Sequence, residues 1–185
     1  MNPTYLIIAV VLILVIMGLI MAPMFARRNR SKRFQNKYGT EYDHTVQTAG
    51  NEKKAQAELN QRQKHVDTLN IRPLSVSERE RYQAEWTAIQ AKFVDQPGQA
   101  TVEADHLIME VMKVREYPVS DFDQRAADVS VNYPTLVSNY RAAREIAIKN
   151  GKHTATTEEL RQALIYYRSL FDELLKEEDV LPEKK

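Results

Sequence analysis

The apolar residues of this chain follow two different patterns. Residues 5–26 form one uncharged run, whereas from residue 52 onward apolar positions recur every three or four residues. The second spacing is typical of helices that bury one face, and no long stretch alternates apolar and polar positions as a strand would. The patterns together predict an all-α fold, with an N-terminal transmembrane helix followed by a small soluble bundle of four to five helices.

The uncharged run predicts a membrane anchor at residues 1–26. As a helix, residues 5–26 would be about 33 Å long, enough to cross a hydrocarbon core of about 30 Å. A cleaved secretory signal is the first alternative, but Met1 to Thr4 carry no basic side chain and the run exceeds the usual apolar stretch of such signals. A buried helix of a soluble protein is the second alternative, although such helices are seldom apolar on every face.

A basic cluster directly after the run predicts its orientation. Lys and Arg resist translocation, so we expect the N-terminus outside and the C-terminal domain in the cytoplasm. The same side chains could contact anionic headgroups at a membrane surface, or they could act as topology determinants alone. The cluster consists of Arg27, Arg28, Arg30, Lys32, Arg33 and Lys37.

Beyond the anchor, four further segments can be distinguished. Residues 27–50 resemble a basic, mobile stalk, in which Gly39 and Gly50 are breaks. Residues 51–70 form helix-favouring sequence with few apolar positions. A helical domain is expected at 71–178 and a disordered tail at 179–185.

Start and stop signals divide the helical domain. Ser75 with Glu78 and Ser77 with Glu80 are alternative capping boxes for one helix start, and Thr156 with Glu159 has the same spacing. Tyr117-Pro118 and Tyr133-Pro134 predict helix ends, because the residue before proline is disfavoured in helical geometry. We expect helices at about 75–95, 99–116 and 121–131, a fourth beginning at Pro134, and a last one beginning after Thr156. Ser120 is the expected cap of the third.

Charge and composition exclude several classes of function. Six of the 26 basic residues precede Tyr38, so residues 38–185 hold 20 basic and 25 acidic side chains, a net charge of −5. Nucleic-acid binding needs a basic face and is therefore not expected. The chain has no cysteine, which excludes disulfides and thiolate chemistry. No motif identifies catalytic residues or a cofactor, so we expect none.

One residue pattern could hold a metal. Glu103, His106 and Glu110 contain the Glu-x-x-His spacing of di-metal bundle proteins, and Glu41 with His44 repeats it. At about 100° per residue, the apolar stripe of the first helix centres between residues 107 and 108, so the trio lies to one side of it. A solvated face is the preferred interpretation, and a metal-dependent enzyme remains the alternative.

The segment from Tyr117 to Tyr140 is dense in aromatic and charged residues. One interpretation is an internal network in which Arg125 pairs with aspartates. The other is a groove that binds a protein partner. The candidate partner surface comprises Tyr117, Asp121, Asp123, Arg125, Asp128 and Tyr133.

Several short motifs, among them Arg81-Tyr82, Tyr117-Pro118 and Tyr133-Pro134, resemble those of a family of small, uncharacterised bacterial single-pass membrane proteins with a C-terminal helical domain. The resemblance implies a bacterial source and an inner-membrane location, and it implies no catalytic residue. The motifs run from Arg81-Tyr82 and Trp86 through Phe93-Val94-Asp95, Glu103-Ala104-Asp105, Glu110-Val111-Met112 and Tyr117-Pro118 to Tyr133-Pro134.

The sequence supports one leading hypothesis of function. We expect a membrane-tethered helical module that binds a protein partner at the cytoplasmic face, with the lipid bilayer as its other partner. A metal-dependent enzyme and a structural homo-oligomer joined through the last helix are the alternatives.

Overall fold

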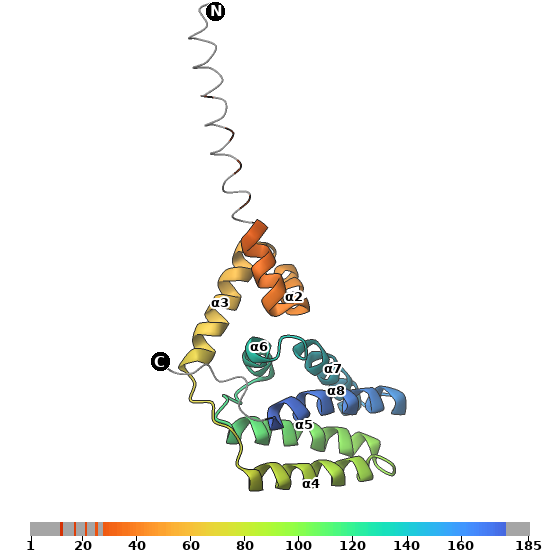
Figure 1. Ribbon diagram of the computed structural model, residues 1–185. Coiled ribbons are helices and arrows are strands. Elements are labelled where there is room, and N and C mark those ends of the chain that lie inside the picture. The colour runs from red at the N-terminus through yellow and green to blue at the C-terminus, as the bar shows by residue number, and fades with distance from the viewer. Residues whose placement is uncertain (1–11, 13–16, 18–20, 22–24, 26–27, 177–185) are drawn as a thin grey trace, which may run out of the picture.

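The computed structural model describes residues 12, 17, 21, 25 and 28–176. Every labelled element is an α-helix, and the described residues contain no strand. Figure 1 shows two parts of the described chain, a helical hairpin made of residues 28–68 and a bundle made of α4 to α8. The labelled helices are α2 (Thr40–Ala49), α3 (Glu52–Thr68), α4 (Val76–Lys92), α5 (Pro97–Val114), α6 (Phe122–Asn132), α7 (Val137–Gly151) and α8 (Thr157–Leu175).

The predicted membrane anchor requires a correction. Among the described residues, no helix combines the length and the apolar character that crossing a bilayer requires. The longest labelled helix, α8, has 19 residues and carries charged residues on one side, whereas a spanning helix must be apolar on every lipid-facing side. Most of residues 1–26, on which the expectation rested, lies outside the described residues. Over the described residues the fold is therefore corrected to all-α without a transmembrane helix, and the inner-membrane location and orientation are withdrawn.

Residues 28–50, expected as a stalk, contain helix instead. A helical segment covers residues 28–38, and α2 follows directly after Gly39. Gly39 and Gly50 have φ angles of +53° and +81°, values that L side chains seldom adopt, so both expected breaks are present. α2 was missed because Tyr42, Val46 and Ala49 are its only apolar residues and give little periodicity.

The hairpin has its own small core. Tyr38 and Tyr42 pack with Ala55 and Leu59 of α3, and all four side chains are buried. The Phe34 ring stacks on Tyr38 with centroids 5.9 Å apart. The hairpin turn is stabilised by Asn51, whose side chain accepts a hydrogen bond from the Lys54 backbone N–H at 2.9 Å.

The bundle has a larger and separate core. α5 packs against both α4 and α8, and α7 packs against α8. At its centre, the fully buried Trp86 of α4 stacks on Phe171 of α8 with ring centroids 4.7 Å apart. Of the predicted capping boxes, Ser75 with Glu78 and Thr156 with Glu159 are formed, whereas Ser77 lies inside α4 and does not cap it.

Two predicted helix starts differ from the structure. The cap of α6 is Asp121, whose Oδ1 accepts from the Gln124 N–H at 2.9 Å, and not Ser120. Residues 134–136 form a turn, and α7 begins only at Val137. Both differences are shifts of one to three residues. Asp121, which also favours the cap position, stands directly after Ser120, and the turn at 134–136 delays the start of α7.

Candidate functional site

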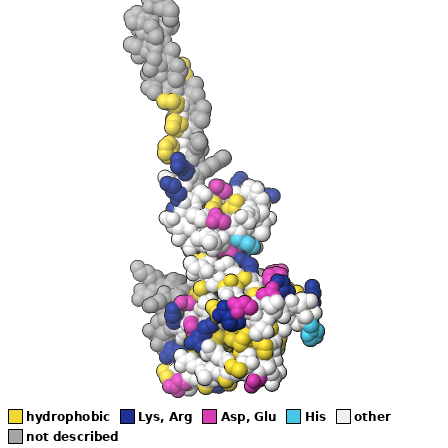
Figure 2. Space-filling view, turned by 90° about the vertical axis from the view of Figure 1, so that its right-hand side faces the viewer, with side chains coloured by type: hydrophobic (Ala, Val, Ile, Leu, Met, Phe, Trp, Pro, Cys, Tyr) yellow, Lys and Arg dark blue, Asp and Glu magenta, His cyan; other side chains and the backbone are white. Residues whose placement is uncertain are grey.

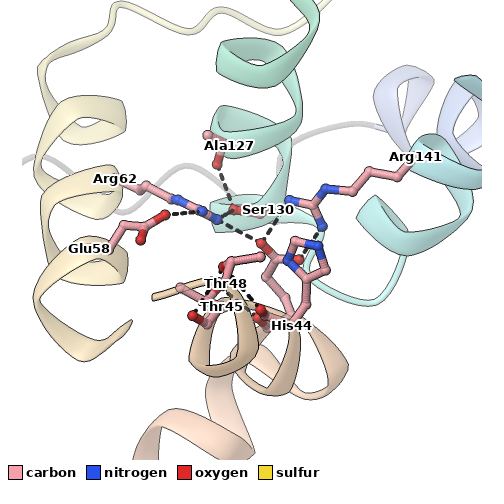
Figure 3. Close-up of polar contacts among 9 residues, drawn as sticks. His44, Thr45, Thr48, Glu58, Arg62, Ala127, Ser130 and Arg141 are labelled. Atoms are coloured by element: carbon pink, nitrogen blue, oxygen red, sulfur yellow. Dashed lines mark hydrogen bonds and ion pairs between the residues drawn. The ribbon is translucent and has the colours of Figure 1, made fainter. Parts of the chain in front are cut away.

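The hairpin and the bundle meet through polar contacts. α3 lies against α6, and α2 reaches α7. Figure 3 shows Arg62 of α3 and Arg141 of α7 converging on the space above α2, beside Ser130 of α6. We call the cluster Glu41, Arg62, Ser130 and Arg141 the polar joint. It connects two apolar cores that are otherwise separate.

Glu41 is the centre of the polar joint. Its side chain is 1% exposed, and its Oε1 accepts from Arg62 Nη1 at 2.7 Å and from Arg141 Nη2 at 2.9 Å. Arg141 Nη1 donates to the other carboxylate oxygen, so this arginine binds Glu41 through both arms of its guanidinium. Such forked, charge-assisted bonds are among the stronger polar contacts in proteins. Glu41 thus links α2 to both α3 and α7.

Electrostatics keeps Glu41 ionised. Burial alone would raise the pKa of this carboxyl, but the hydrogen bonds and charges of Arg141 and Arg62 outweigh burial and hold the pKa below its ordinary value. Arg62 Nη1 also donates to Ser130 Oγ at 3.2 Å, and that hydroxyl donates to the Ala127 carbonyl at 2.6 Å. The buried Glu41 carboxylate therefore has a positively charged partner on two sides, Arg62 from α3 and Arg141 from α7.

A second buried carboxylate lies close to the polar joint. Asp128 of α6 is fully buried, its Oδ1 accepts from Gln124 Nε2 at 2.8 Å, and His65 Nε2 of α3 lies 3.7 Å away. The other oxygen, Oδ2, has no hydrogen-bond partner among the described residues. Burial raises the pKa of Asp128, and the bond from Gln124 and the nearby His65 only partly offset this effect. Asp128 is thus an internal carboxylate whose charged form is disfavoured.

Replacing Asp128 with asparagine should stabilise the chain at pH 7. A carboxyl with a raised folded pKa contributes stability below its ordinary value of 3.8, and this contribution is lost as pH rises through the folded value. Asparagine carries no charge at either pH, so the variant avoids that loss. Urea unfolding at pH 4 and pH 7 measures the free energy of unfolding, which Asp128→Asn should raise more at pH 7 than at pH 4.

Asp123→Asn, the same change at an exposed position of α6, is the matched control and should leave the free energy of unfolding unchanged at both pH values. A variant Asp128→Asn that lost the same stability at both pH values would contradict the assignment.

An open cleft lies beside these groups, between α3 and α6. Its volume is about 510 Å³, within the range of ligand and peptide sites. α3 and α6 form its two walls, and we call it the α3–α6 cleft. Its lining consists of Glu58, Gln61, Arg62 and His65 from α3, and Asp121, Asp123, Gln124 and Ala127 from α6 and its cap.

The structure separates the residues of the candidate partner surface. Tyr117, Arg125, Asp128 and Tyr133 are buried, so they cannot form an accessible surface in this conformation. Asp121 and Asp123 are exposed and line the cleft.

The alternative for this segment was an Arg125–aspartate network. The Arg125 side chain instead donates to the Tyr140 hydroxyl at 3.2 Å and to the Val119 carbonyl at 3.4 Å, both of which are neutral acceptors. Tyr133, in turn, accepts a hydrogen bond from Arg115 Nη1 at 3.1 Å. These buried groups fasten the turns around α6.

The possible metal ligands Glu103, His106 and Glu110 share one groove between α4 and α5. Glu103 is bound there by Lys92, at 2.6 and 2.8 Å, and by Gln99 at 3.0 Å. In the part of the chain that the structure describes, no group of three His, Asp or Glu side chains is arranged to hold a metal ion. Glu41 of the second pair is occupied by two arginines.

Comparison of the chain with protein-family models, curated proteins and solved structures found no match.

Proposed function

We propose that this chain is a helical interaction module that binds a cationic segment of a partner protein in the α3–α6 cleft. The observation that carries the proposal is the cleft itself, about 510 Å³ in volume and bordered by exposed carboxylates. Residues 38–185, with 20 basic and 25 acidic side chains, have a net charge of the same sign.

The charge inside the cleft supports a cationic ligand. The single arginine in the lining, Arg62, is neutralised by salt bridges to Glu41 and Glu58. Asp121 accepts hydrogen bonds from the Gln124 N–H and the Ser120 hydroxyl, which lower the pKa of its carboxyl, and the charge of Arg125 makes a smaller contribution. Asp123 forms no salt bridge within the described residues. Asp123 therefore keeps its negative charge available to a Lys or Arg side chain, and Asp121 adds a second carboxylate that Arg125 offsets in part.

The two walls of the cleft give the proposal a second feature. One wall belongs to the hairpin and the other to the bundle, and the polar joint fixes their separation through Glu41. A segment that enters the cleft would contact both parts. Preformed geometry of this kind lowers the conformational cost of binding.

The alternatives receive less support. A metal-dependent enzyme would need Glu103 released from Lys92 and Gln99. A homo-oligomer joined through α8 would need an apolar outer face on that helix. Its leucines, Tyr167 and Phe171 are buried in the bundle core, Tyr166 is half-buried, and Ile165 is its one exposed large apolar side chain.

Photo-crosslinking in the native host tests the proposal. A photoreactive amino acid at Gln61, an exposed position of the cleft, should capture a discrete protein through a Lys- or Arg-rich segment. Asp123→Lys should reduce capture at least about tenfold, because a like charge opposes the ligand.

Asp95→Lys is the matched control, since it makes the same charge change at an exposed site after α4. Capture should persist in this variant. Equal loss in both variants, attachment through an acidic or apolar segment, or capture of only a second copy of the chain would each refute the proposal.

A further inference from the structure

The helical segment 28–38 is strongly basic and contains no acid. Its cations are Arg28, Arg30, Lys32, Arg33 and Lys37, and the first acidic residue of the chain is Glu41. Elsewhere many cations are paired, as in Lys92 with Glu103 and Lys149 with Glu159. Figure 2 shows Lys and Arg side chains gathered where this segment meets the hairpin.

Three of these cations line one pocket. Arg30, Arg33 and Lys37 are spaced three and four residues apart, so they share a helix face. With Phe34, Tyr38 and Asn60 they surround a pocket of about 320 Å³. Asn60 comes from α3, so the pocket lies between two helices.

Contacts with α3 hold one cation in place. Lys37 Nζ donates to Gln63 Oε1 at 2.7 Å and lies 5.0 Å from the centre of the Tyr38 ring. The Tyr38 hydroxyl donates to the same amide oxygen at 3.3 Å. The ammonium is therefore oriented by neutral groups that leave its charge unbalanced.

No carboxylate among the described residues lines this pocket. Glu41, the first acidic residue after the segment, binds Arg62 and Arg141. Within the described residues, no carboxylate forms a salt bridge with any of the three cations of the pocket. Three like charges around one hollow repel each other, and an anion between them would relieve that repulsion.

We propose that this pocket binds a phosphate monoester. A phosphate dianion has the charge and the several acceptor oxygens that two guanidinium groups and an ammonium can satisfy together. The volume admits a phosphate with a small organic group, for which Phe34 provides an apolar wall. The phosphate could belong to a free metabolite or to a lipid headgroup, because the recognised chemistry is the same.

Calorimetric titration of the purified full-length chain in nonionic detergent tests the pocket. Phenyl phosphate should bind at one site, and phenyl sulfate, which has the same shape but a single charge, at least about tenfold more weakly. Arg30→Ser with Arg33→Ser should weaken phenyl phosphate binding at least about 30-fold, because two charge-assisted hydrogen bonds are lost.

Arg28→Ser with Lys32→Ser is the matched control. It removes two charges from the same segment without touching the pocket lining, so binding should change less than about threefold. Circular dichroism checks that both variants keep their helix content. Equal weakening by both pairs would reveal attraction by net charge alone and overturn the site, as would undetectable binding to the unaltered chain.

A second arm distinguishes the two sources of phosphate. Mixed micelles containing phosphatidic acid, a monoester, are compared with micelles containing phosphatidylglycerol, a diester. Preference for phosphatidic acid over phenyl phosphate identifies a headgroup site, whereas the reverse preference identifies a site for free phosphate monoesters. Equal binding to the two lipids, unaffected by the Arg30 and Arg33 substitutions, would contradict the proposal.

Discussion

Glu41→Ala should release the hairpin from the bundle without unfolding the bundle. Arg62 and Arg141 would lose their common partner, and breaking a buried ion pair typically costs 3–5 kcal/mol. The two arginine side chains are 15% and 24% exposed and can be partly hydrated, so we expect about 3 kcal/mol. Hydrogen exchange measures this locally: amides of α2 and α3 should lose protection while those of α4, α5 and α8 keep theirs.

Glu58→Ala is the control for this effect. Glu58 also pairs with Arg62, but its side chain is 42% exposed, so its loss should cost less than about 1 kcal/mol. Equal protection losses in both variants would contradict a central role for Glu41.

Acid should have the same effect as Glu41→Ala. A carboxyl whose pKa is lowered in the folded state stabilises the fold at pH values above its ordinary pKa of 4.5, and this stabilisation is lost as pH falls through the folded-state pKa.

Trp86→Ala should destabilise the bundle by about 3–5 kcal/mol, a large share of the total stability of a typical domain. The indole is fully buried and stacked on Phe171, so truncation leaves a cavity between α4 and α8. Urea unfolding followed by circular dichroism measures the loss. Trp86→Phe should cost less than half as much, because it retains a ring and removes an indole N–H that has no hydrogen-bond partner among the described residues.

Gln90→Ala provides the comparison, since this α4 side chain is exposed and its truncation should change stability by less than about 0.5 kcal/mol. If Trp86→Ala lowered stability no more than this control, the stacked pair could not be the centre of the core.

Local signals explain which parts of the fold could be predicted. The capping boxes at Ser75 and Thr156 depend on residues three positions apart, and the structure contains both. α2 was missed because its buried residues include Glu41 and Thr45, which carry no hydrophobic period. The expected anchor fell on residues that lie mostly outside the described part of the chain.

The candidate site was harder to predict because its partners are distant in sequence. Glu41 stands 21 residues from Arg62 and 100 from Arg141, so no local spacing relates them. The sequence did indicate Asp121 and Asp123, which line the cleft. It did not indicate that Tyr117 and Tyr133 would be buried, because burial depends on how the helices assemble.

A hydrogen-exchange footprint tests the central claim most directly. The segment identified by crosslinking from Gln61 is synthesised as a peptide and added to the purified full-length chain. The α3–α6 cleft predicts slower exchange in residues 58–65 and 121–128, with α4 and α5 unchanged. Protection confined to the groove between α4 and α5, or the absence of protection in both walls of the cleft, would contradict the account.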